Sequence, residues 1–173
     1  MNQRERNDYW KKLATDHIQV AHNAVIADIT RNSFLVDIAD EVEASEIINL
    51  HFPCVAVYNI VGRVVIKEDQ RRMRYQNRLS FLNRFSIESN EDATIPTSKA
   101  MAFSTTYEVM MDFLNKLQSN YEDAAPCFLF KFIDENSYRW ESVELVGSGM
   151  CGWELYFNDE EPANFLIDES KWS

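Results

Sequence analysis

The chain has 173 residues, of which 46% are hydrophobic and 13% aromatic, and its formal net charge is −11 at pH 7. A chain of this length fits one domain and can bury about 70% of the surface that its unfolded form would expose. The acidic balance argues against a nucleic-acid-binding or membrane-binding surface over the whole body, and the low Gly and Pro content argues against disorder. We therefore expect a single domain over 1–173.

Targeting and redox signals are sparse. The N-terminal stretch has no apolar segment typical of a secretory signal, and no run approaches the ~18 apolar residues of a membrane helix. Cys54, Cys127 and Cys151 are an odd number without a C-x-x-C pair. We interpret them as reduced, mostly buried thiols in a cytosolic setting.

The first half of the chain predicts a helix followed by strands. Apolar residues recur at near-helical spacing over about 4–26, and the alternation over 33–39 predicts a strand with Phe34, Val36 and Ile38 on one face. An acidic connection of uncertain type follows. The continuous apolar run 52–65 predicts a central strand that is buried on both faces.

A returning strand is predicted over 78–87, antiparallel to the run before it. The polar stretch between them would form a hairpin arm of about 62–80. After a loop, Thr97 or Ser98 can cap a helix over 98–118. One face of that helix is predicted to hold an apolar stripe of Phe103, Tyr107, Met110, Leu114 and Leu117.

The C-terminal part predicts three strands, at 127–133, 137–147 and 149–158, with the last two joined by a turn at Gly147–Gly149. For the tail, about 159–173, the sequence predicts neither a helix nor a strand. This order favours an α+β fold in which helices pack on one face of an antiparallel sheet and a long β-hairpin protrudes.

Catalytic and metal-binding patterns are weak. His17 and His22 lie on different sides of a helix, so they are poor joint metal ligands. His51 and Cys54 could act as base and thiol, but a buried thiol beside a surface histidine is the favoured interpretation. We interpret the acidic pairs as solvated surface. No nucleotide-binding or hydrolase motif occurs in the sequence. The sequence therefore predicts no enzyme, no cofactor and no metal site.

Positive charge is concentrated in one short segment. Seven of the 17 Lys and Arg residues lie between Arg63 and Arg84, against only Glu68 and Asp69, so this segment carries +5 and the remainder carries −16. A basic arm on an acidic body is complementary to a second copy in a head-to-tail sense.

The order of elements resembles small virion proteins of tailed bacteriophages, of the neck-ring or tail-terminator type found in phages and prophages of gut Bacteroidetes, including the crAss-like group. The resemblance is carried by the opening YWKKLATDHIQVAH, the strands FLVDIA, FPCVAVYNI and LSFLNRFSI, the helix TSKAMAFSTTYEVMMDFLNKL, and the closing GWELYF and DESKW. It covers nearly the whole chain in organisation and rests on no diagnostic motif.

The resemblance implies a structural protein that forms a closed ring at the phage neck or tail and joins capsid portal and tail around the DNA channel. Its partners would be copies of itself and neighbouring portal, connector or tail proteins, with DNA contacted at most non-specifically and no membrane. It would be made in the host cytoplasm and reside in the virion. The expected subunit interface is Arg63, Val64, Val65, Ile66, Lys67, Arg71, Arg72, Met73, Arg74, Tyr75 and Arg78.

Two other interpretations of the basic segment stay open. It could grip nucleic-acid phosphates through Arg71, Arg72, Arg74 and Arg78, with Tyr75 interleaved. It could also be only a solvated hairpin, as charge runs usually are.

Overall fold

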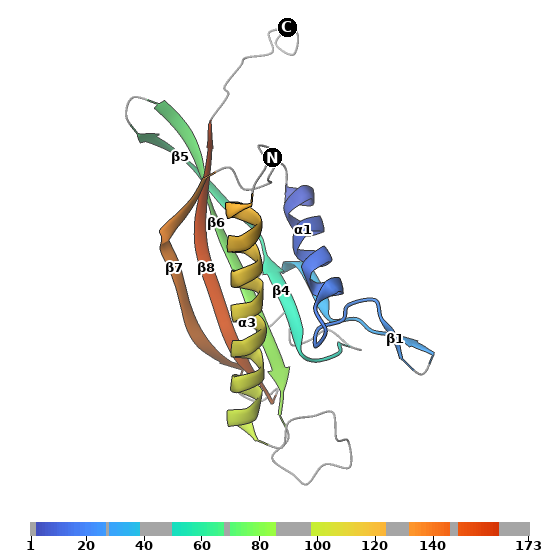
Figure 1. Ribbon diagram of the computed structural model, residues 1–173. Coiled ribbons are helices and arrows are strands. Elements are labelled where there is room, and N and C mark those ends of the chain that lie inside the picture. Colours follow the sequence, from blue (N-terminus) through green and yellow to red (C-terminus); the bar gives the residue numbers. More distant parts are fainter. Residues whose placement is uncertain are drawn as a thin grey trace, which may run out of the picture.

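The computed structural model describes residues 3–26, 28–38, 50–67, 70–85, 98–123, 132–145 and 149–162. This part of the chain is mixed α/β, with two helices and a mostly antiparallel sheet (Figure 1).

The elements in chain order are α1 (Gln3–Asp16), β1 (Val25–Ile26), β2 (Ile29–Thr30), β3 (Phe34–Ile38), β4 (Cys54–Tyr58), β5 (Val61–Lys67), β6 (Gln70–Arg84), α3 (Lys99–Glu122), β7 (Phe132–Leu145) and β8 (Met150–Pro162). The main sheet has the order β3-β4-β6-β8-β7, and β5 pairs with β6. A separate antiparallel pair joins β1 and β2.

The long strand β6 organises the sheet. One of its edges pairs antiparallel with β8 from Arg72↔Pro162 to Arg84↔Met150. Its other edge pairs antiparallel with β5 at residues 70–76 and with β4 at residues 79–82. Gly152 lies opposite Leu82, and a Cβ at Gly152 would stand 1.8 Å from the Phe81 carbonyl oxygen, so this close approach of two backbones requires glycine.

The apolar run 52–65 forms two strands instead of the one predicted. Its first part, β4, is buried at every position between β3 and β6, as the sequence predicted for a central strand. The strand is interrupted at residues 59–60, and β5 that follows is mostly exposed. Periodicity missed the break because Val and Ile continue across it.

Two apolar clusters lie on opposite faces of the sheet. The larger joins Trp10 and Leu13 of α1 and Phe113 and Leu117 of α3 to alternate side chains of the strands, among them Leu79, Phe81, Leu155 and Phe157. The smaller contains Leu35, Ile38, Cys54, Ala56, Tyr58 and Leu82. We call the first side the helix face and the second the open face.

Helix α3 begins where the sequence predicted. Ser98 is the N-cap, and its side chain accepts a hydrogen bond from the Met101 N–H at 3.2 Å. The predicted stripe is partly wrong, because Tyr107 is 38% exposed and Phe103 only half-buried. The buried face is Ala102, Thr106, Val109, Met110, Phe113, Leu114 and Leu117. Small Ala102 and Thr106 occupy the core positions that the pattern gave to larger residues.

Helix α1 ends at Asp16, ten residues before the predicted end near 26. The His17 ring nitrogen accepts hydrogen bonds from the Gln19 and Val20 N–H groups, so a side chain competes with helical bonding there. Ala21 and Asn23 then adopt positive φ, and the chain turns into the β1–β2 hairpin. The apolar residues beyond 17 imitated a helical period without continuing the helix.

Strand β3 also departs from simple alternation. Its register with β4 shifts between Leu35 and Ile38. Phe34 therefore joins the helix-face cluster, whereas Ile38 joins the open-face cluster and Val36 is 39% exposed. The predicted shared face of Phe34, Val36 and Ile38 is wrong because one irregularity reverses the alternation.

The two closing strands pair as predicted, but β7 begins at Phe132 and runs through residues 134–136, so the predicted division between strands at 127–133 and 137–147 is wrong. The register of β7 with β8 shifts between Asp134 and Arg139, where the polar residues suggested a break. β7 and β8 are antiparallel with Leu145 opposite Met150. The predicted acidic connection, the loop before α3, most of the strand at 127–133, most of the turn at 147–149 and most of the tail lie outside the described residues.

The burial of α3 makes a prediction about stability. Leu114 is 6% exposed, so Leu114→Ala should lower the free energy of unfolding by about 2–5 kcal/mol through lost burial and a residual cavity. Tyr107→Ala, on the exposed side, should cost less. Urea denaturation of both variants measures this, and equal losses would contradict the orientation of α3 described here.

Candidate functional site

The basic strand β6 faces an acidic strand. β6 carries five arginines and no acidic residue, and β8 carries Glu154, Asp159, Glu160 and Glu161 and no basic residue. The two strands pair along almost their whole length. Much of the positive charge that is conspicuous in the sequence is therefore compensated within the chain, across one strand pair.

Glu160 is the centre of one open-face cluster. Arg74 lies directly opposite it and donates to Oε1 from Nε at 2.8 Å and from Nη2 at 2.5 Å. Arg72 Nη1 lies 3.6 Å from Oε2. Burial alone would raise the pKa of the Glu160 carboxyl, but the hydrogen bond and charge of Arg74 outweigh burial and lower this pKa.

Glu154 is the centre of a second cluster on the same face. Arg78 holds both of its carboxylate oxygens, at 3.2 and 2.8 Å, and Ser80 donates to it at 2.7 Å. The Arg78 guanidinium lies 4.0 Å from the ring centroid of Tyr58. Tyr156 also donates to Glu154, and burial, followed by that hydrogen bond, raises the pKa of the Tyr156 phenol. Tyr156 thus remains a hydrogen-bond donor at neutral pH.

A buried salt bridge on the helix face was missed by sequence reasoning. Arg6 of α1 binds Asp159 of β8 through two hydrogen bonds of 2.5 and 2.7 Å, and each side chain is 1% exposed. Asn77 of β6 accepts from Arg6 at 3.1 Å and donates to Asp159 at 2.7 Å. The available signal was the position of Arg6 four residues before Trp10, on the buried side of α1.

Tyr75 extends this network toward β5. The Arg6 guanidinium lies 4.4 Å from its ring centroid, and its hydroxyl donates to Glu161 at 2.5 Å. Burial, followed by the hydrogen bond to Glu161, raises the pKa of Tyr75 to about 12. The root of the β5–β6 pair is therefore held on the helix face by Arg6 and on the open face by Glu160.

We call residues 61–67 and 70–76 the arm. Paired residues of adjacent strands project to the same side, so the register gives the arm two different faces. Its basic face carries Arg63, Lys67, Arg72 and Arg74, interspersed with Val61 and Val65, and its apolar face carries Val64, Ile66 and Met73, with Arg71 opposite Ile66. Val64 is 50% exposed and Ile66 is 73% exposed.

The predicted interface residues are thus divided between two roles. Arg72, Arg74, Tyr75 and Arg78 contact carboxylates of β8 in the same chain. Arg63 and Arg71 are exposed and form no ion pair with the residues that the structure describes. Val64, Val65, Ile66, Lys67 and Met73 lie in the arm.

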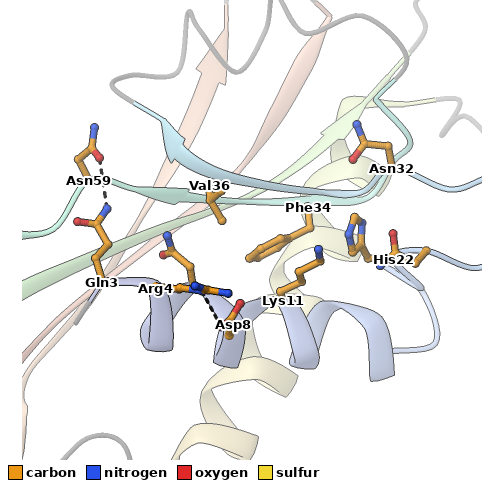
Figure 2. A pocket seen from close by; sticks show the side chains of 11 residues that line it. Gln3, Arg4, Asp8, Lys11, His22, Asn32, Phe34, Val36 and Asn59 are labelled. Carbon is orange, nitrogen blue, oxygen red and sulfur yellow. Dashed lines mark hydrogen bonds and ion pairs between the residues drawn. The ribbon is translucent and has the colours of Figure 1, made fainter. Parts of the chain in front are cut away.

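A polar depression lies between α1 and β3 (Figure 2). Its volume is about 850 Å³, and its lining includes Gln3, Lys11, His22, Asn32 and Asn59. The Arg4 and Asp8 side chains at its rim are 90% and 70% exposed, which favours solvation over ligand binding. Burial, with the charge of Lys11, lowers the pKa of His22, and its Nδ1 accepts from the Ser33 N–H at 3.3 Å.

A second, more apolar depression lies where the end of α1 meets the middle of α3. We call it the interhelical groove; its volume is about 500 Å³, and it is lined by Leu13, Asp16, His17, Ile18, Gln19, Asp112, Phe113 and Lys116. Ile18 at its edge is 93% exposed, and His17 Nε2 lies 3.2 Å from Asp112 Oδ2. It combines aliphatic and aromatic walls with two acidic side chains.

Cys54 and His51, the candidate thiol and base, form no hydrogen bond with each other in the described part of the chain. Cys54 and Cys151 are free and buried, and burial raises the pKa of Cys54 to about 12 and that of Cys151 to about 11. The His51 ring accepts from the Asn32 N–H at 3.1 Å. Cys127 lies outside the described residues. Within the described ranges, no group of three or more His, Cys, Asp or Glu residues could hold a metal ion.

Comparison with protein-family models finds no match, and comparison with curated protein sequences finds none either. Neither α1 nor α3 is long and apolar enough to cross a membrane, and only the described residues bear on this.

The Arg6–Asp159 salt bridge can be tested by a double-mutant cycle. Arg6→Met should lower the free energy of unfolding by about 3–5 kcal/mol, because it leaves Asp159 charged, buried and uncompensated. Asp159→Asn added to Arg6→Met should cost much less than it does alone. Chemical denaturation measures the cycle, and strictly additive losses would contradict direct coupling.

The lowered pKa of Glu160 makes a prediction about pH. A carboxyl with a depressed folded-state pKa adds stability above its unfolded pKa of about 4.3, and this stability is lost as pH falls through the folded-state value. Glu160→Gln should therefore be less stable than wild type at pH 7, and the difference should shrink as pH falls toward 3. Glu108→Gln, on the exposed side of α3, is the matched control. A constant difference for Glu160→Gln would contradict the prediction.

Proposed function

We propose that the protein is a non-enzymatic structural subunit that assembles head to tail into a closed ring at the neck or tail of a tailed bacteriophage. In this proposal the helices cover one face of the sheet, and the arm protrudes to contact the adjacent subunit. The ring joins portal and tail around the DNA channel, and neighbouring connector or tail proteins are its other partners.

The exposed strand β5 is the observation that carries this proposal. Six of its seven residues are exposed, including the branched side chains of Val61, Val64 and Ile66. Within the described part of the chain β5 pairs only with β6, so its second edge has backbone groups without a ladder partner. An exposed edge strand with aliphatic side chains is a template for association with another chain.

The anchoring of the arm supports a role in assembly. Asn77, which bonds to both Arg6 and Asp159, and Tyr75, which bonds to Glu161, hold β6 on the helix face, and Arg74–Glu160 holds it on the open face. A segment that is ordered before binding loses less conformational entropy when it meets a partner. The apolar face would supply most of the interface energy, while exposed charged pairs add about 0.2–1 kcal/mol each.

Fewer side chains support the interpretation of the protein as a nucleic-acid-binding module. Arg72, Arg74 and Arg78 already face Glu160 or Glu154, so fewer charges remain for phosphate than the sequence suggested. The basic face of the arm still carries Arg63 and Lys67. A non-specific contact with DNA in the channel is compatible with this charge, and strong independent DNA binding is not expected.

Assembly should depend on the apolar face of the arm. Ile66→Glu should shift the protein from an oligomer to a monomer in sedimentation velocity, because it places a charge in a contact that must be desolvated. Met101→Glu is the matched control, since Met101 is 54% exposed on α3, away from the arm. Circular dichroism should show both variants folded.

Three outcomes separate the interpretations. A wild-type protein that stays monomeric at high concentration would overturn the ring proposal. An Ile66→Glu variant that assembles like wild type would remove the arm from the interface. Loss of DNA association in Arg63→Glu/Arg71→Glu with unchanged assembly would favour the nucleic-acid interpretation.

A further inference from the structure

The arm and the interhelical groove have complementary shape and chemistry. The arm is a two-stranded projection that offers Val64, Ile66 and the positive charge of Arg71 on one face, while Arg63 and Lys67 lie on its other face. The groove is concave, has Leu13, Ile18 and Phe113 in its walls, and carries the negative charges of Asp16 and Asp112. Each surface therefore supplies what the other lacks.

The two surfaces lie apart in the molecule. Figure 1 shows β5 at the upper left, and the end of α1 to the right of the middle of α3, near β1. The arm therefore does not reach the groove within one copy of the chain. They can meet between copies, and a contact between two different patches is heterologous, which closes into a ring when the rotation permits.

We propose that the apolar face of the arm of one subunit docks in the interhelical groove of the next subunit, with Arg71, which shares that face, directed at Asp16 and Asp112. This inference rests on the ring proposal and names the surface that receives the arm. The occupant of the groove is a second copy of this chain.

The charges around the groove fit this occupant. Asp112 is 64% exposed although it contacts His17, so one side of its carboxylate remains available to a cation from outside. Lys116 is the one Lys or Arg side chain in the groove lining, which also holds His17, against the two aspartates. Ile18, at 93% exposure, is costly to leave in water and would be covered by the docked arm.

A mixing experiment tests the heterologous contact. Ile66→Glu damages only the arm and Ile18→Glu damages only the groove, so each variant alone should be monomeric in sedimentation velocity. An equimolar mixture should form a 1:1 heterodimer and nothing larger, because one intact arm meets one intact groove. Val25→Glu is the control for Ile18→Glu, since Val25 is 68% exposed and is not part of the groove lining.

Charge reversal gives a second, independent readout. Arg71→Glu and Asp16→Lys/Asp112→Lys should each weaken assembly, and a chain that carries all three changes should regain it. Arg63→Glu, on the opposite face of the arm, is the matched control and should assemble like wild type. Thermal unfolding of each variant controls for folding.

The outcomes distinguish the two proposals. If Ile18→Glu and Asp16→Lys/Asp112→Lys assemble like wild type while Ile66→Glu does not, the groove inference fails and the ring proposal stands. If the two single variants do not form a heterodimer, the head-to-tail docking of arm into groove is overturned. If the wild-type protein does not self-associate, both proposals fail.

Discussion

The buried salt bridge between Arg6 and Asp159 is the interaction on which the arrangement of this chain depends. It connects the first turns of α1 to the C-terminal strand β8 through two hydrogen bonds that are almost completely shielded from water. Two such charges are costly to bury, and the cost is offset only when both are fully hydrogen-bonded, which Asn77 completes. The same guanidinium supports Tyr75, so one contact fixes the helix, the central strand and the root of the arm.

The distribution of charge in this protein follows from the pairing of a basic strand with an acidic strand, more than from the net charge of any one segment of the sequence. The basic strand β6 and the acidic strand β8 run antiparallel, and the carboxylates of Glu154 and Glu160 are covered by arginines that are themselves partly exposed. The net charge counted over residues 63–84 therefore overstated how many positive side chains are available to a partner. What remains beyond this pairing is concentrated on the arm, at Arg63, Lys67 and Arg71, beside exposed Val64 and Ile66. This combination suits an acidic and apolar protein surface better than a phosphate backbone.

The sequence predicted those elements whose conformation is determined by residues close together in the chain. The capped helix after Ser98, the buried strand β4 and its antiparallel return in β6 each followed from periodicity and capping chemistry. It failed where a tertiary or irregular contact decides the outcome. The end of α1 depends on hydrogen bonds that the His17 ring accepts from backbone N–H groups, and the faces of β3 depend on a register shift. The pairing of the β6 arginines was not visible because their partners in β8 lie more than 70 residues along the chain from them. The groove could not be predicted, since it forms from residues of α1 and α3 that only the fold brings together.

If the arm of one subunit docks in the groove of the next, the two surfaces are halves of one repeating contact, and that contact determines the geometry of the assembled protein. Electron microscopy of the purified full-length chain at high concentration observes this geometry directly. We expect closed rings of uniform diameter, in which each subunit extends a projection over its neighbour. Particles of single-subunit size, or two-fold symmetric dimers joined arm to arm, would contradict this proposal.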